Sequence, residues 1–181
     1  MKNIIYIIIL FFFFSCNETS RKKIKDKKSK FSTSDASEIF FKNVRQRYYD
    51  RIEMQEAKLN IYRLQERSLE ADYPNIILAI VINWSYDEAY ILLEPNELVP
   101  ENEIKIMWVT KDSLSTGNYT FNYGDKISHF EFASQIYSNL NSDHVLFIFS
   151  NNENVPFLNN DKDRDTFRKT MRDYYRLIDL M

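Results

Sequence analysis

Glycine is nearly absent from this chain of 181 residues, which contains only Gly117 and Gly124. Glycine allows a backbone to turn sharply or to approach a phosphate closely, because it has no Cβ atom. The phosphate-binding P-loop and the dinucleotide-binding fingerprint both need closely spaced glycines, which these two positions do not provide. The sequence therefore excludes the common glycine-rich nucleotide-binding folds.

The N-terminal residues have the pattern of an export signal. Lys2 is followed by an unbroken apolar run from Ile4 to Phe14, and then by Ser15 and Cys16. As a helix this run would be about 16 Å long, which is too short for a hydrocarbon core of about 30 Å. The pattern is therefore typical of a signal peptide over residues 1–15 rather than of a membrane-spanning helix.

The stretch Phe13-Phe14-Ser15-Cys16 resembles the lipobox of bacterial lipoproteins, although Phe13 stands where that family usually has Leu. In that family the cysteine is acylated and becomes the first residue after cleavage. The resemblance implies a lipid anchor at Cys16, attachment to a membrane, and a location in the cell envelope, on the outer membrane or the periplasmic face. Because Cys16 is the only cysteine, an intramolecular disulfide is impossible.

A basic segment follows the cysteine. Residues 17–33 contain seven Lys or Arg and two acidic side chains, a net formal charge of +5. We interpret residues 16–34 as the lipidated cysteine and a flexible tether; contact of these charges with anionic lipid head groups is the alternative. One signal opposes export, because positive charges after an apolar run favour a cytoplasmic C-terminal side.

Residues 34–181 are acidic, with 16 basic and 24 acidic side chains and a net charge of −8. This balance disfavours nucleic acid as a partner. With 44% hydrophobic and 15% aromatic residues, the chain has enough apolar surface for a folded core. We expect residues 35–181 to form a single globular α+β domain.

The expected domain begins with a helix from about residue 35 to 56. Ser34 or Asp35 is expected to cap it, with Glu38 completing a capping box. Its apolar face is formed at helical spacing by Phe41, Val44, Tyr48 and Ile52. Residues 58–65 are compatible with either a continuation of this helix or a strand.

An antiparallel sheet of about five strands is expected to follow. The runs 76–82, 90–94 and 104–110 form its meander, with Ile104, Ile106 and Trp108 pointing inward. Shorter strands are expected at 118–123, 145–149 and 155–158.

Two more helices are expected to pack on this sheet. Asp125 is placed to cap an inserted helix that carries Ile127, Phe130, Tyr137 and Leu140. A C-terminal helix is expected over residues 162–180, with Phe167, Met171, Tyr174 and Ile178 buried.

Asp161, Asp163 and Asp165 begin like a calcium loop. However, Thr166 stands where such a loop needs glycine, and Arg172 stands where it needs a bidentate carboxylate. We expect these acids instead to complement the positive N-terminal end of the last helix.

No catalytic or metal-binding signature stands out. His129 and His144 are the only histidines, and neither has a second His or Cys at metal-ligand spacing. We therefore predict no catalytic residue, no metal and no cofactor, and a chain that is not an enzyme. A pair of carboxylates for glycoside hydrolysis stays open, because the chain has many acids and none is singled out.

The leading hypothesis is a membrane-anchored envelope lipoprotein with a non-catalytic domain that binds another protein; one specialised form is an immunity lipoprotein that neutralises a toxin. The alternative is a module that binds a small ligand or glycan, and an unrecognised hydrolase comes third. Trp84 and Tyr86, at an expected hairpin turn, are the aromatic pair that we expect to be exposed for recognition.

Overall fold

The computed structural model describes residues 30–69 and 72–181. The predicted signal peptide, Cys16 and most of the predicted tether lie outside the described residues. The compact unit begins at Phe31. The last tether positions therefore belong to the folded part: Phe31 is buried, Ser32 forms a β-bridge with Glu88, and the N–H of Thr33 donates to the carbonyl of Asp87.

The described chain contains two antiparallel four-stranded sheets and three helical regions, which confirms the α+β class. Sheet 1 has the order β1-β2-β3-β4, with strands β1 (Tyr49–Met54), β2 (Leu59–Leu64), β3 (Ile76–Asn83) and β4 (Glu88–Pro95). Sheet 2 has the order β6-β5-β7-β8, with strands β5 (Ile104–Val109), β6 (Thr116–Phe121), β7 (Val145–Ser150) and β8 (Glu153–Phe157). The first helical region consists of α3 (Asp35–Phe40), the π-helical η2 (Phe41–Arg45) and the 3₁₀-helical η3 (Gln46–Tyr48), and the others are α4 (Lys126–Asn141) and α5 (Asp161–Leu177).

The single five-stranded sheet is one part of the fold prediction that is wrong. Strands β3 and β4 pair as expected, but β5 pairs with β6 and β7 in sheet 2. The segment 96–103 separates β4 from β5, and it is longer than the 2–5 residues of a hairpin loop. Within it Val99 is buried, and the Asn96 N–H donates to the Asn75 carbonyl, so the segment connects two sheets rather than two neighbouring strands.

The predicted first helix begins at the expected residue and ends early. Ser34 caps it, but Ser37 rather than Glu38 completes the capping box. The helical region stops at Tyr48, and residues 49–54 form β1 instead. Pairing with β2 decides the outcome, because the strand at 59–64 offers a complete antiparallel register. The strand alternative for 58–65 is thereby confirmed.

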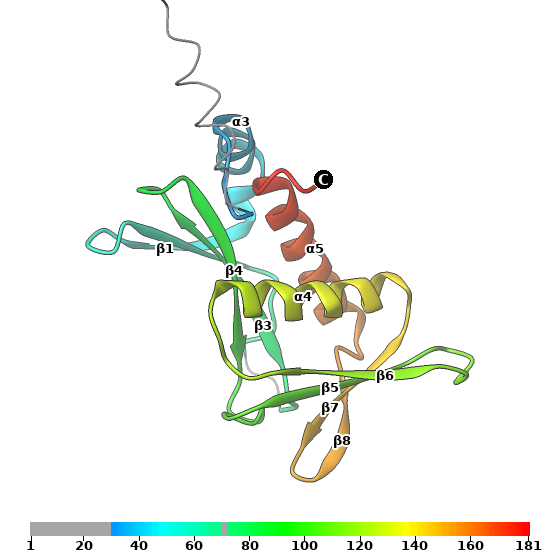
Figure 1. The fold of residues 1–181 in the computed structure, drawn as a ribbon. Coiled ribbons are helices and arrows are strands. Elements are labelled where there is room, and N and C mark those ends of the chain that lie inside the picture. Colours follow the sequence, from blue (N-terminus) through cyan, green and yellow to red (C-terminus); the bar gives the residue numbers. More distant parts are fainter. Residues whose placement is uncertain (1–29, 70–71) are drawn as a thin grey trace, which may run out of the picture. The chain divides into compact units, whose positions relative to one another are not determined.

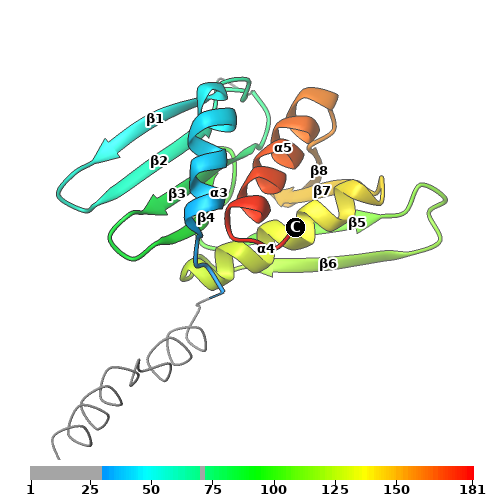
Figure 2. The same cartoon turned by 90° about the horizontal axis from the view of Figure 1, so that it is seen from above.

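Helices α4 and α5 lie on the inner faces of the two sheets (Figures 1 and 2). Helix α4 contacts β4 of sheet 1 and both β6 and β7 of sheet 2, while α5 contacts β3 and β4. Residues of both sheets and of these helices form one buried core. Helix α4 therefore joins the sheets, and each sheet keeps an outer face that no described helix covers.

Local predictions for the other elements hold in most details. Asp125 caps α4 by accepting from the N–H groups of Ile127 and Ser128. Ile127 itself is exposed. Strand β5 directs Ile104 and Ile106 into the core and leaves Trp108 half-buried. All four residues predicted for the buried face of the last helix are buried: Phe167, Met171, Tyr174 and Ile178.

Candidate functional site

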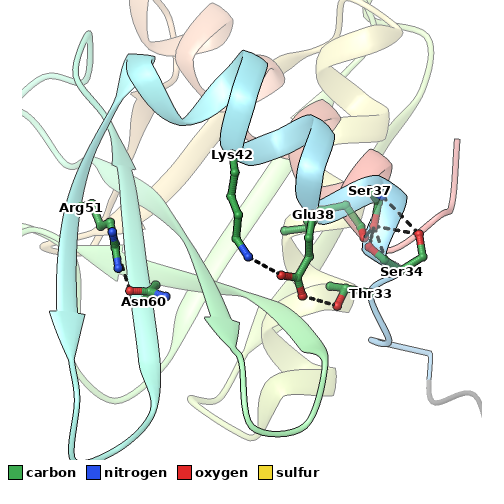
Figure 3. A network of polar contacts seen from close by, with 8 residues as sticks. Thr33, Ser34, Ser37, Glu38, Lys42, Arg51 and Asn60 are labelled. Carbon is green, nitrogen blue, oxygen red and sulfur yellow. Dashed lines mark hydrogen bonds and ion pairs between the residues drawn. The ribbon is translucent and has the colours of Figure 1, made fainter.

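Polar contacts fasten the first helical region to the domain (Figure 3). Glu38 accepts from the Thr33 hydroxyl at 2.7 Å and pairs with Lys42 at 2.8 Å. The Ser37 hydroxyl donates to the carbonyl of Leu177 at 2.7 Å, which ties α3 to the end of α5. Each charged side chain in this group has a structural partner, so the group serves the fold and offers no free acid or base.

Asp163 is a buried acid with a structural role. Its carboxylate accepts hydrogen bonds, each 2.6 Å long, from the Ser68 hydroxyl, the Tyr73 hydroxyl and the Asn160 amide. Burial acts to raise the pKa of Asp163, but these three bonds outweigh it, and the pKa is lowered. The helix cap is Asn160, so Asp163 does more than complement the helix end: it connects α5 to the segment that follows β2.

Asp173 is the second buried acid of α5. It accepts from the Arg45 guanidinium at 2.9 Å and from the Tyr49 hydroxyl at 2.7 Å. Burial first, and then the charge of Asp173, raise the pKa of Tyr49. Asp163 and Asp173 are ten residues apart on one helix, or about 15 Å along its axis. That separation exceeds the spacing of about 5–9.5 Å used by glycosidase carboxylate pairs.

The two histidines have separate surroundings. His129 accepts the backbone N–H of Leu93 on its Nδ1 atom at 3.1 Å, and burial lowers its pKa. His144 stacks on Trp108, with ring centroids 4.9 Å apart. Across residues 30–69 and 72–181, no group of three His, Cys, Asp or Glu side chains is arranged to hold a metal ion.

The outer face of sheet 1 carries an apolar row that crosses all four strands. The register places Ile52 opposite Ile61, Ile61 opposite Val81, and Val81 opposite Tyr90. The side chain of Ile52 is 52% exposed, while Ile61 and Tyr90 are half-buried and cover Val81 between them. We call these four residues the outer row.

The outer row has an apolar neighbour on one side and an ion pair on the other. Met54 and Leu59 pair next to the row, towards the hairpin turns. On the other side, the Arg63 guanidinium on β2 reaches Glu94 on β4 through contacts of 2.6 and 2.5 Å. Because β3 lies between β2 and β4, this ion pair crosses over β3. The apolar surface of the outer face ends at the ion pair.

Both hairpin turns of sheet 1 lie at the Met54 end of this surface. The N–H of Trp84 donates to the carbonyl of Lys58 at 3.3 Å, which places the two turns side by side. The Lys58 ammonium lies 5.8 Å from the centre of the Trp84 ring. Trp84 is 45% exposed and Tyr86 is 75% exposed. Their role in recognition stays a prediction.

The described residues also line hollows that are open to solvent. One of about 270 Å³ lies on the outer face of sheet 2 and is lined by residues that include Met107 and Phe149. Another of about 260 Å³ lies between η2 and α5, where Arg172 and Arg176 line it beside the Arg45–Asp173 pair. Neither is an enclosed apolar pocket of the kind that holds most small ligands.

Sequence reasoning missed the outer row because it assigned Ile52 to a helix. The signal was present in the alternation of Ile52 with Met54 and of Leu59 with Ile61, on either side of a short turn. Such two-residue alternation is typical of a hairpin with one apolar face.

No described helix is both long enough and apolar enough to span a membrane. Comparison with protein-family models, curated proteins and solved structures finds no match to this chain.

Proposed function

We propose that this chain is an envelope lipoprotein, anchored through Cys16, whose domain binds another protein through the outer face of sheet 1. The observation that carries the binding proposal is the outer row on a sheet face without a described helix, in which Ile52 is exposed, Ile61 and Tyr90 are half-buried, and Val81 is buried between them. Contiguous apolar surface that remains exposed on a folded domain marks interaction sites.

The surface has the composition of a protein interface. The apolar row would form its centre, and the Arg63–Glu94 ion pair and the polar turn residues would form its rim. Trp84 and Tyr86 add large amphipathic rings at one end, and such rings are frequent at interaction hot spots. The net charge of −8 over residues 34–181 would favour the approach of a basic partner.

The binding proposal can be tested with two matched double variants. Ile61→Ser with Tyr90→Ser removes apolar contact from the outer face of sheet 1. Val145→Ser with Phe149→Ser removes apolar surface from the outer face of sheet 2, where both residues are exposed. We expect one envelope protein to be captured by the wild type and by the sheet 2 variant but not by the sheet 1 variant. Equal capture of that protein by both variants would contradict the proposal, provided that circular dichroism shows both to be folded.

The anchor is tested separately by mass spectrometry of the chain purified from membranes. We expect an N-terminus at an acylated Cys16, and loss of both processing and membrane attachment in a Cys16→Ser variant. An intact Met1 together with an unmodified thiol would contradict the anchor and leave the binding proposal standing.

Glycan binding is the alternative, and the exposed rings of Trp84 and Tyr86 are the observation that favours it. Such rings could stack on sugar faces, with Lys58 beside one of them. A thermal-shift screen against glycans and lipids would support this alternative if a ligand stabilised the wild type but not a Trp84→Ala variant. A hydrolase is the third hypothesis, and Asp163 and Asp173 do not form its pair of acids, because each is engaged in a separate hydrogen-bond network.

A further inference from the structure

Strand β1 is an open edge of sheet 1. Among the described residues it pairs only with β2. Just outside this ladder, the N–H of Gln65 donates to the carbonyl of Tyr48, so these two residues form a hydrogen-bonded pair. Such pairs recur at every second residue, so the even-numbered residues of β1 are the ones that bond to β2. The odd-numbered residues therefore direct their backbone N–H and C=O groups away from β2. These residues are Tyr49, Arg51 and Glu53.

The side chains along this edge alternate in character. Ile52 points to the outer face and is 52% exposed. Arg51 and Glu53 point to the inner face, are exposed, and lie within 2.6 Å of each other. An exposed edge with free backbone groups is a template for another strand, and the side chains determine which strand fits.

Among the antiparallel registers centred on the exposed residues 50–53, one suits a second copy of β1. A two-fold axis at Asp50, Arg51 or Glu53 would set that charged residue opposite itself, and like charges directly opposite are destabilising. An axis at Ile52 places Arg51 of each copy opposite Glu53 of the other copy, which gives two pairs of opposite charge. The same axis sets the two exposed Ile52 side chains against each other.

We propose that two copies of this chain pair through β1 about a two-fold axis at Ile52, which joins their two four-stranded sheets into one sheet. In this register Arg51 and Glu53 form the hydrogen-bonded pairs, whose residues exchange both backbone bonds. The two outer rows become one continuous row across the axis. The inference goes beyond the proposed function and does not depend on the anchor or on another protein.

Disulfide trapping tests the register. Because residues 30–181 contain the whole described core, the test uses a chain that starts at Lys30 and has no other cysteine. Two Ile52 residues on the axis would form a non-hydrogen-bonded pair with Cα atoms about 4.5 Å apart, within the range that a disulfide bridges. We expect Ile52→Cys to form a covalent dimer under mild oxidation.

Asp50→Cys is the matched control on the same strand and face. The proposed axis places Asp50 opposite Met54 of the second copy, so that the two Asp50 residues are four positions, or about 13 Å, apart. We expect no disulfide between two such chains. A covalent dimer of Asp50→Cys that forms as readily as that of Ile52→Cys would overturn the proposal.

Charge exchange tests the pairing without a cysteine. Arg51→Glu alone or Glu53→Arg alone turns two attractive pairs into two repulsive ones, and we expect the dimer dissociation constant to rise about tenfold. The double variant Arg51→Glu with Glu53→Arg restores opposite charges and should restore the wild-type constant. Sedimentation equilibrium that finds the wild type monomeric up to millimolar concentration, or a double variant as weak as either single one, would overturn the proposal.

Discussion

Replacement of Asp163 by Ala is the sharpest test of the packing described above. Asp163 is 5% exposed, and its carboxylate accepts hydrogen bonds from three neutral donors. A hydrogen bond to a charged group contributes about 1.5–3 kcal/mol to stability. Ser68 and Tyr73 are half-buried and regain water after the change, so we expect a loss of about 3 kcal/mol rather than the full sum.

The loss should be measured as the free energy of unfolding in urea, followed by circular dichroism, with thermal melting as a second measure. For a domain of this size, about 3 kcal/mol lowers Tm by roughly 6–12 °C. Asp165→Ala is the matched control on the same helix, because the Asp165 side chain is 61% exposed and its ion pair with Arg168 is long, at 3.6 Å. We expect that control to change the unfolding free energy by less than about 0.5 kcal/mol.

The loss should also depend on pH, with a sign set by the lowered pKa of Asp163. A carboxyl whose pKa is lower in the folded state contributes its stability above its ordinary pKa of 3.8, and loses it as the pH falls through the folded value. The difference in unfolding free energy between wild type and Asp163→Ala should therefore be largest at neutral pH and shrink below about pH 4. A difference at neutral pH no larger than that of Asp165→Ala would refute the structural role of this acid.

Three further predictions concern other parts of the domain. Gly117→Ala should lower the unfolding free energy by about 1–3 kcal/mol and alter the near-UV circular dichroism of Trp108, because the added Cβ would lie 2.7 Å from that ring. An unchanged spectrum would count against the packing of Trp108 on Gly117. Burial lowers the pKa of His129 below its ordinary 6.5, so its contribution to the unfolding free energy is full above pH 6.5 and falls below that pH. The difference in unfolding free energy between wild type and His129→Gln should therefore narrow from pH 7 to pH 5. A difference that widens would contradict the buried, neutral ring that accepts the Leu93 N–H. Trp84→Ala should change the unfolding free energy by less than about 0.5 kcal/mol, because the ring is 45% exposed; a larger loss would assign it to the fold.

The strands and helices that could be predicted are those with a strong local signal. Strand β3 is buried along most of its length, so it appears as an unbroken apolar run from Ile76 to Ile82 that is mostly β-branched. Helix α5 buries one stripe, so its apolar residues recur at helical spacing. In both elements most of the residues that the apolar pattern of the sequence predicts to be buried are buried in the structure.

Strand β1 was missed because two periods overlap in it, the helical spacing and the two-residue alternation of a strand. Phe41, Val44, Tyr48 and Ile52 have helical spacing, yet only Phe41 is buried. What decides the structure is pairing with β2, a contact between segments that local spacing does not encode. The outer row and the open edge depend on the same register, so neither could be derived before β1 was known to be a strand.

Trp84 and Tyr86 could be placed at a turn because polar residues follow the apolar run of β3. Their exposure follows from that turn, whereas their position beside Lys58 requires the neighbouring hairpin. The networks around Asp163 and Asp173 were missed for a similar reason, because most of their donors come from segments far away in the sequence.

The central claim is that the outer face of sheet 1 contacts another protein, and photo-crosslinking in intact cells tests it most directly. A photoreactive phenylalanine analogue replaces Tyr90, which lies on β4 at the opposite edge from the β1 strand of the proposed dimer. The same analogue at Phe149, on the outer face of sheet 2, is the control. We predict a discrete adduct with a different protein from position 90 and none from position 149. The absence of an adduct at position 90, or the same adduct at both positions, would contradict the claim.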